Sequence, residues 1–254
     1  MPSPSDTSGT SNTAGTATPG TGPRSGRRHR VREEALAEIL RTGRRLLVEE
    51  GPGAVTLRAI AREMGMTAPG LYRYHAGHRE LVQALAASLY EELAAALAAA
   101  RDRHRGAGPG PQLRAVCREL RRWALAHPKE FGLLFAKPVS DADTAPGTAA
   151  HDSGWRFGGV VLDLMVRLWQ DGGVRPAAGL DPVWAAQLEE VREHLSGEPV
   201  PLEAIYVFVA CWARLYGTVA VEVFGHLDFA LTDPEPLFEQ CLDDILTTLG
   251  SPPP

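Results

Sequence analysis

The stretch from Val55 to Tyr74, VTLRAIAREMGMTAPGLYRY, constrains the fold of this chain more than any other segment. Its first half predicts a short helix, because Thr56 is a good N-cap residue and apolar residues follow it at helical spacing. Those apolar residues are Leu57, Ile60, Ala61 and Met64. Gly65 follows, where the end of a helix needs a residue that tolerates a positive φ. The segment therefore predicts a short helix followed by a tight turn.

A second short helix is predicted directly after this turn. Met66 can fill the gap between the two helices, and Thr67 can cap the second one. Pro69 lies in its first turn, where a missing N–H costs nothing, and Leu71 faces inward. This is the helix-turn-helix arrangement, which places its second helix in a DNA major groove. A helical hairpin with a glycine turn would show the same pattern, so both interpretations stay open at this point.

The wider segment from about Val31 to Leu93 resembles the DNA-binding domain of the TetR family of bacterial transcription regulators. The resemblance is carried by ILRTGRRLLVEEGPGAVTLRAIAREMGMTAPGLYRYHAGHRELVQAL, which contains the Thr-x-x-x-Ile-Ala core, the Gly-Met turn and the Leu-Tyr-x-Tyr run. Two positions depart from the family pattern. His75 stands where Phe is common, and His78 stands where a Lys often begins the next helix and touches a phosphate. His78 would make that contact weaker or dependent on pH.

The expected fold is all-α, with an N-terminal three-helix helix-turn-helix domain followed by a helical ligand-binding and dimerisation domain. We expect residues 1–30 to be a disordered tail with a basic arm, residues 31–93 to be the DNA-binding domain, and residues 94–250 to be the regulatory domain. The tail is rich in Ser, Thr, Gly and Pro, so it cannot offset the entropy lost on ordering. The arm, Arg24–Arg32, is either a phosphate-binding segment or a solvated charge run.

Hydrophobic periodicity and glycine or proline breaks set the expected helices. They cover residues 31–50, the two short helices above, and then 77–100, 113–127, 130–136, 155–170, 182–195, 202–224 and 234–249. The segments 101–112 and 137–154 are expected to be irregular, because glycine and proline end helices. No alternation typical of strands is found along the chain.

The net charge of −5 at first argues against a protein that binds nucleic acid. Its distribution reverses this impression. Residues 24–82 hold 12 Arg and 7 acidic residues, whereas residues 83–254 hold 14 basic and 23 acidic residues. A basic N-terminal segment attached to an acidic body is the distribution that a local DNA contact requires.

Composition and motifs exclude several other classes of protein. The 3 cysteines are far apart and form no Cys-x-x-Cys pair, so neither a disulfide framework nor a zinc site is indicated. A glycine-rich phosphate loop, a His-Glu-x-x-His helix and a nucleophile elbow are all missing, so we expect no enzyme and no cofactor. We see no apolar run that approaches the length of a membrane span, and we expect no membrane partner and a cytoplasmic location.

Contacts to DNA divide into those that position the protein on phosphates and those that read base edges. For phosphates, the resemblance and the polar chemistry indicate Tyr72, Arg73, Tyr74 and His78, together with the N–H groups at the start of the following helix. For Tyr72 the alternative is a core aromatic with a wet tip.

Base reading would fall to the exposed start of the second short helix. Its residues are Thr67, Ala68, Pro69 and Gly70. They carry few hydrogen-bond donors, so Arg58 in the preceding helix is the best candidate for a bidentate contact to guanine, unless it is a plain surface arginine. One such helix reads too few base pairs for useful specificity, so we expect a homodimer on a near-palindromic double-stranded DNA operator.

The body is where the dimer interface and a small apolar effector are expected. Candidate interface residues are Ile205, Val209, Trp212, Ala213, Tyr216, Ala220, Leu237, Cys241, Ile245 and Leu249. Candidate effector-binding residues are Phe131, Phe135, Trp155, Met165, Trp169, Trp184 and Tyr206. Each of these residues could instead belong to the core of one subunit. An alternative function is a helical interaction module that binds DNA nonspecifically and has no effector pocket.

A second resemblance concerns the segments AHPKEFGLLF and CWARLYGTVAVEVFGHL. They are similar to a regulatory domain named for a Trp-His-Gly signature, which occurs in some TetR-type proteins. The corresponding residues here are Trp212, Tyr216 and Gly217, so a tyrosine stands where that signature has histidine.

Overall fold

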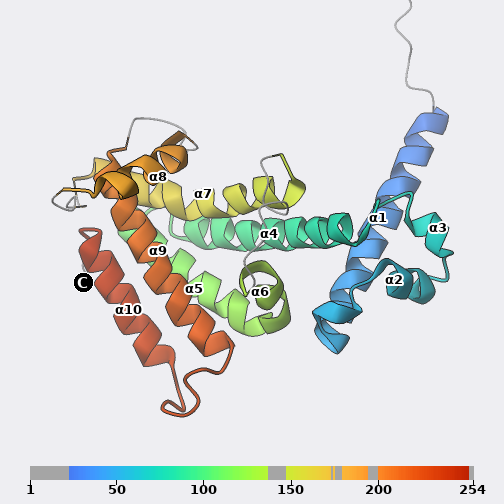
Figure 1. The fold of residues 1–254 in the computed structure, drawn as a ribbon. Coiled ribbons are helices and arrows are strands. Elements are labelled where there is room, and N and C mark those ends of the chain that lie inside the picture. Colours follow the sequence, from blue (N-terminus) through green and yellow to red (C-terminus); the bar gives the residue numbers. More distant parts are fainter. Residues whose placement is uncertain (1–22, 137–146, 173, 175–178, 194–199, 252–254) are drawn as a thin grey trace, which may run out of the picture. The chain divides into compact units, whose positions relative to one another are not determined.

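The computed structural model describes residues 23–136, 147–172, 174, 179–193 and 200–251 of the chain. All regular elements within these residues are helical, which confirms the all-α expectation (Figure 1). The chain divides into two compact units, residues 1–38 and residues 39–254, and each is described by itself.

The first unit contains the beginning of α1, which spans Pro23–Glu50. The sequence predicts that this helix begins at Val31. In the structure it begins eight residues earlier, so the basic segment Arg24–Arg32 is part of the helix. Arginine is a good helix former, and proline is well tolerated as the first residue of a helix, which is the position of Pro23. The expected tail therefore overlaps the first turns of α1, and residues 1–22 lie outside the described residues.

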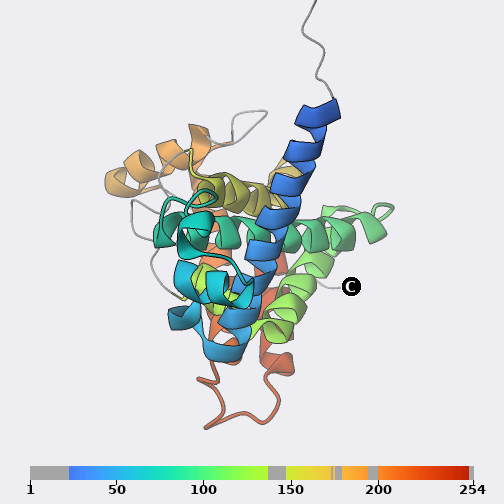
Figure 2. The ribbon, with the colours of Figure 1, turned by 90° about the vertical axis from the view of Figure 1, so that its right-hand side faces the viewer.

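The second unit begins with the rest of α1, the 3-10 turn η1 (Pro52–Ala54) and the two short helices α2 (Leu57–Glu63) and α3 (Ala68–Leu71). Their apolar faces meet in one buried cluster. From residue 39 to the start of the next helix it contains Ile39, Leu46, Leu47, Val55, Leu57, Ile60, Ala61 and Leu71. Figure 2 turns the end of this unit that carries α2 and α3 toward the viewer. The predicted three-helix arrangement is present.

The helix α4 (His78–Arg103) packs against α5 (Pro109–Ala126), α6 (Pro128–Phe135) and α7 (Ala149–Gln170). One leucine in every four positions along α4 is buried: Leu81, Leu85, Leu89, Leu93 and Leu97. Spacing by four residues keeps these side chains on one face of the helix. The same helix thus contributes to the core near α2 and to the core of the helical body.

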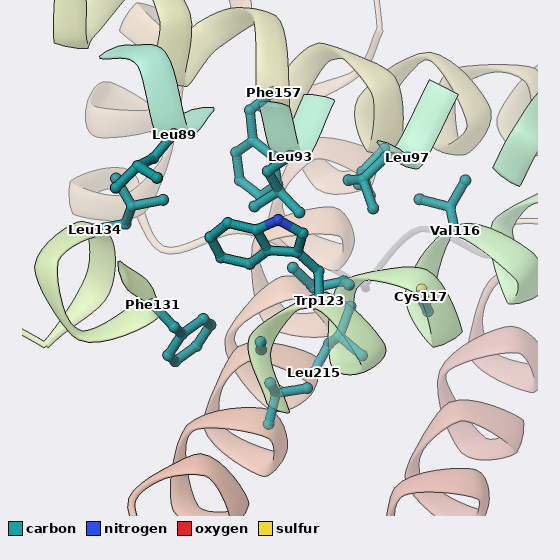
Figure 3. Packing of buried hydrophobic residues seen from close by; sticks show 14 of the residues in the cluster. Leu89, Leu93, Leu97, Val116, Cys117, Trp123, Phe131, Leu134, Phe157 and Leu215 are labelled. Carbon is teal, nitrogen blue, oxygen red and sulfur yellow. The ribbon is translucent and has the colours of Figure 1, made fainter. Parts of the chain in front are cut away.

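Trp123 of α5 occupies the middle of the core of the body (Figure 3). Its ring is surrounded by side chains from α4, α5, α6, α7 and α9, and only 5% of it is exposed. The labelled neighbours are Leu89, Leu93, Leu97, Val116, Cys117, Phe131, Leu134, Phe157 and Leu215. Its indole N–H donates to the Glu92 carboxylate at 3.0 Å, so the one polar atom of the ring has a partner.

Three further helices complete the described body. They are α8 (Pro182–Glu193), α9 (Leu202–Val223) and α10 (Glu235–Thr248). The last two lie side by side and antiparallel (Figure 1), and the Arg214 guanidinium of α9 pairs with Asp244 of α10 at 3.3 Å. The C-terminal helices agree with expectation to within one or two residues.

Besides α1, two helices begin four or more residues earlier than expected. The first, α5, contains Pro109, Gly110 and Pro111, which had been assigned to a break. Proline is tolerated in the first turn because that N–H has no intrahelical partner, so these residues begin the helix instead of ending one. The second, α7, begins at Ala149, where the Thr148 hydroxyl accepts from the His151 N–H at 3.2 Å.

By length and composition, α4 and α9 could each cross a membrane, although no apolar run of this length was expected. In the structure their leucines and valines face the core between helices. A core helix passes the same test of length and composition, so the finding is weak evidence for a membrane.

The turn between α2 and α3 allows a test of whether its backbone conformation requires glycine. Gly65 has φ +62°, and a Cβ there would have open space around it. We expect Gly65→Ala to lower the free energy of unfolding by about 1–2 kcal/mol, because only the left-handed backbone opposes the methyl group. Gly53 of η1 has an equally open Cβ position and no positive φ, so Gly53→Ala should change stability by less than about 0.5 kcal/mol. Urea unfolding of both variants measures the difference, and equal losses would contradict the assignment.

Candidate DNA interface and internal cavity

The turn between α2 and α3 is held by the caps that the sequence predicts. The Thr56 hydroxyl accepts a hydrogen bond from the Ala59 N–H at 3.1 Å, and the Thr67 hydroxyl accepts one from the Gly70 N–H at 3.3 Å. At Gly70 a Cβ would lie only 3.2 Å from the Thr67 hydroxyl oxygen, so a side chain there would press on the cap. The start of α3 therefore presents backbone and small side chains, which allow close approach by a partner.

The structure places the predicted DNA-contact residues on one short stretch. Those that are exposed are Arg58, Thr67, Pro69, Tyr72, Arg73 and His78, and those that are half-buried are Ala68, Gly70 and Tyr74. Half of Tyr72 is exposed, whereas Tyr74 packs against the core. A backbone hydrogen bond from the Tyr74 N–H to the Leu71 carbonyl fixes this turn at 2.9 Å.

Charge pairing separates the cations of this region into two groups. Among the described residues, Arg58, Arg62 and Arg73 have no acidic partner, whereas Arg45 binds Glu63 at 2.6 Å and Glu49 at 3.0 Å. Exposed arginines without a partner can bind phosphate or base edges without first breaking an ion pair. Arg62 is not indicated by the sequence, because nothing in the pattern shows which arginines the fold pairs.

The start of α4 follows directly. Gly77 is its N-cap, and the Glu80 carboxylate accepts a hydrogen bond from the Ala76 N–H. Gly77 supplies no side-chain cap, so the first N–H groups of α4 have no intrahelical partner, and His78 beside them is exposed. His75, which stands where the TetR pattern favours Phe, is 4% exposed and occupies the position of a core aromatic.

An ion-pair network ties α1 to the body. The Arg44 guanidinium donates to Glu92 of α4 at 2.6 Å and to Glu130 of α6 at 3.0 Å. Only 5% of the Glu130 side chain is exposed. Glu92 also accepts from Trp123. Burial alone raises the pKa of Glu92, but the hydrogen bonds from Arg44 and Trp123 outweigh this effect and hold the pKa below its usual value.

A cavity of about 1190 Å³ lies within the second unit. Its walls come from the first half of α4, from α6, α7 and α9, and from single residues of η1 and α8. The wall is mostly apolar, and its aromatic members are Tyr90, Phe135, Trp155, Phe157, Phe208, Trp212 and Phe224. The size and the apolar wall are those of a site for a small organic molecule.

The cavity brings together only part of the effector-binding set expected from the sequence. Phe135, Trp155 and Met165 line it, and Phe131 lies behind Phe135 with the two ring centroids 4.8 Å apart. Trp169 does not line it. Neither do Trp184 and Tyr206, which pack edge to face at 5.5 Å on α8 and α9.

Several wall residues were missed by the sequence analysis. Tyr90, Phe157 and Phe208 are among them, and Trp212 had been assigned to the dimer interface. Each lies on a helix face that looks like ordinary core in the sequence. No signal of spacing distinguishes a cavity wall from a packed core.

The residues predicted to form a dimer interface fall into two groups, those inside the chain and those on its surface. Ile205, Ile245 and Leu249 are buried within the chain, and Val209 and Trp212 line the cavity. Leu237 is 43% exposed and Ala213 is exposed, so they remain on the outer face of α9 and α10.

Tyr216 is the residue that stands in place of the histidine of the Trp-His-Gly signature. Its hydroxyl donates to the Phe135 carbonyl at the end of α6, at 2.8 Å. The ring stacks on Trp212 at 6.5 Å. The tyrosine therefore ties α9 to the end of α6.

Two family models match this chain. Residues 39–85 match the model of the bacterial regulatory proteins of the tetR family, and residues 113–245 match the C-terminal domain of tetracyclin repressor-like proteins. The narrower assignment to a Trp-His-Gly domain stays a prediction.

Curated relatives and solved structures give the same result. The HTH-type transcriptional regulator Rv1816 of Mycobacterium tuberculosis is 30% identical over 224 residues, which are 85% of this chain and 92% of the relative. The crystal structure of a regulatory protein, SCO4313, is 30% identical with a TM-score of 0.65, and the match covers 86% of this chain and 98% of that one. A TetR family regulator from Marinobacter aquaeolei VT8 shares the fold at 16% identity, with a TM-score of 0.56 and coverage of 87% and 97%.

The Arg44 network generates a prediction for stability. Arg44→Leu should lower the free energy of unfolding by about 2–4 kcal/mol, because it leaves the buried Glu130 carboxylate without its cation. Arg45 is nearly half exposed in its pairs, so Arg45→Leu should cost at most about 1 kcal/mol. Chemical denaturation at pH 7 measures both losses.

The same variant should change the acid response. Because the folded-state pKa of Glu92 is lowered, its stabilisation is present above the unfolded pKa of about 4.3 and is lost as pH falls through the folded value. In Arg44→Leu this part of the acid dependence should shrink. An unchanged slope of stability against pH below pH 5 would show that Arg44 does not hold Glu92.

Proposed function

This chain belongs to the TetR family of bacterial transcription regulators, and from that premise we propose that it binds a near-palindromic operator as a homodimer and changes its operator affinity when a small molecule enters the cavity. It is a regulator and not an enzyme. The observation that carries the DNA part of the proposal is the set of exposed, unpaired arginines around α2 and α3 among the described residues.

We assign Arg58 to base reading and Arg62 and Arg73 to phosphates. Arg58 lies near the start of α2, and Arg62 lies in its last turn. The exposed residues Thr67 and Pro69 at the start of α3 offer a hydroxyl and an apolar surface to base edges. The Tyr72 hydroxyl and the start of α4 at His78 would add phosphate contacts.

The dimer interface is proposed for the outer face of α9 and α10. Regulators of this family bind DNA and act as dimers. The outer face carries small or exposed apolar residues, including Ala213 and Leu237. A two-fold axis here would place two copies of α3 on one operator and would double the number of base pairs read.

The cavity supplies the proposed regulatory step. Its walls include α4 and α6, and the Arg44 network joins the same two helices to α1. A ligand that favours one arrangement of α4 and α6 would therefore favour one spacing of the two recognition helices in the dimer. We propose repression by operator occlusion as the mode and the cytoplasm as the location.

The competing function is a helical interaction module that binds DNA nonspecifically. Selection from random duplexes separates the two, because a regulator enriches a palindrome and a nonspecific binder enriches none. Size-exclusion chromatography with light scattering measures the oligomeric state in the same preparation, and a monomer that selects no sequence would reject the proposed function.

Two arginine variants test the division between base and phosphate contacts. Arg58→Ala should cost about 1–3 kcal/mol at one operator position and relax the preference there. Arg62→Ala should weaken binding to all sequences alike and reduce the salt slope by about one. Arg105, which is exposed and pairs with Asp102 at the far end of α4, provides the control Arg105→Ala, expected to leave both unchanged. A uniform loss in Arg58→Ala would reassign that residue to phosphate.

Two neighbouring glycines of α7 test the cavity. Gly158 lines it and Gly159 does not, and a Cβ at either position meets nothing within 4 Å. Gly158→Phe should occupy part of the cavity and weaken binding of the neutral apolar dye Nile red, whereas Gly159→Phe should leave dye binding intact. Fluorescence titration of purified protein measures both. Equal dye binding by the two variants would place the dye site elsewhere.

A further inference from the structure

The charged side chains among the described residues of the cavity wall are all basic. Among the described residues that line it there is no Asp or Glu, although the chain carries a net charge of −5. The charged and titratable side chains that do line it are His78, Arg79, Lys129 and His151, together with Tyr90. A cavity with cations and without carboxylates favours an anion inside an otherwise acidic protein.

Two of these cations form no ion pair within the described part of the chain. Arg79 and Lys129 have no acidic partner among the described residues. The carboxylates next to them in the sequence are already engaged, because Glu80 accepts from the Ala76 N–H and Glu130 accepts from Arg44.

The arginines of the rest of the described body, in contrast, form ion pairs. From residue 101 onward each described arginine lies within ion-pair distance of an acidic residue: Arg101, Arg103, Arg105, Arg114, Arg118, Arg121, Arg122, Arg156, Arg167, Arg192 and Arg214. Unpaired cations in the described part of residues 42–254 therefore occur at two places, the helix-turn-helix face and the cavity wall.

The two cations come from different helices of the wall. Arg79 is in the first turn of α4, the end of that helix that adjoins α3, and Lys129 is in the first turn of α6. The helix α8 and the start of α9 lie toward the opposite end of α4 (Figure 1), and they contribute the apolar wall residues Val191 and Ile205. The cations of the wall therefore belong to α4 and α6, and the wall at α8 is apolar.

We infer that the ligand of this cavity is an amphipathic anion, with its acidic headgroup between Arg79 and Lys129 and its apolar chain or ring system directed toward α8. The inference rests on the proposed function only in taking the cavity as a ligand site. A volume of about 1190 Å³ accommodates an apolar part of a dozen or more carbon atoms together with the headgroup. Hydrogen bonds from Arg79 and Lys129 to an anion are charge-assisted and favour it over a neutral group of the same shape.

The test compares two probes that differ only in the headgroup, dodecanoate and dodecanol, below their aggregation limits. Their binding is followed by displacement of Nile red and by the fluorescence of the wall residues Trp155 and Trp212. Wild-type protein should bind dodecanoate at least about tenfold more tightly than dodecanol, and salt should reduce the difference.

Charge variants locate the headgroup. Lys129→Gln and the double variant Arg79→Gln with Lys129→Gln should weaken dodecanoate binding stepwise by roughly fivefold and more, while dodecanol binding stays within about twofold. Arg105→Gln removes an exposed cation elsewhere and should change neither probe. Thermal unfolding confirms that each variant is folded.

The outcomes separate this inference from the proposed function. Equal affinity for the two probes, or a preference for dodecanoate that survives in the double variant, would overturn the assignment of the headgroup. Failure of both probes to bind would overturn it together with the ligand site. A preference for dodecanoate without any change in operator affinity would support the headgroup assignment and reject only the ligand-responsive regulation.

Discussion

The leucine ladder of α4 is the constraint on which the rest of the structure depends. Leu81 and Leu85 belong to the core beside α2 and α3, and Leu89, Leu93 and Leu97 belong to the core around Trp123. Close-packed cores have few alternative arrangements, so α4 can move only together with the groups that its leucines contact. A helix that contributes to both cores is therefore suited to carry a displacement from the cavity to the helix-turn-helix segment.

The arginines of the body and those near the proposed binding sites differ in whether they form ion pairs. In the body nearly every described arginine is paired, which fixes helices to one another across α4, α5, α9 and α10. On α2 and the turn after α3 the arginines stay unpaired, as does the cationic end of the cavity. Unpaired, exposed cations are available to ligands, whereas paired ones would have to give up an existing interaction. This contrast is more informative than the net charge, which alone would argue against DNA binding.

Local chemistry made the helix-turn-helix segment predictable. The caps at Thr56 and Thr67 and the left-handed Gly65 depend on residues only a few positions away. Such local features can be predicted from the sequence without knowing the tertiary structure. The starts of α5 and α7 lie before the positions that the sequence predicts, because glycine and proline usually end helices, although proline fits the first turn of a helix.

The cavity could be predicted only in part. It is formed mainly by α4, α6, α7 and α9, whose mutual placement no periodicity reveals, so the sequence indicates Phe135, Trp155 and Met165 but not Tyr90, Phe157 and Arg79. Trp169 and Tyr206 look equally suitable in the sequence and lie elsewhere in the fold. The unpaired state of Arg62 and Arg79 is likewise a property of the folded chain, since it depends on which carboxylates other groups have taken.

The first turn of α6 joins the two proposed activities within three consecutive residues. Lys129 lines the cavity, Glu130 binds Arg44 of α1, and Phe131 packs behind the cavity wall on Phe135. Lys129 and Glu130 are neighbours in one helical turn, so a headgroup whose binding to Lys129 shifts the first turn of α6 also shifts Glu130. Since Glu130 is buried and its carboxylate needs the Arg44 cation, the guanidinium has to follow or the ion pair has to break. Either response acts on α1, which packs against α2, so the cavity and the DNA-binding residues would be coupled through contacts that the fold already contains.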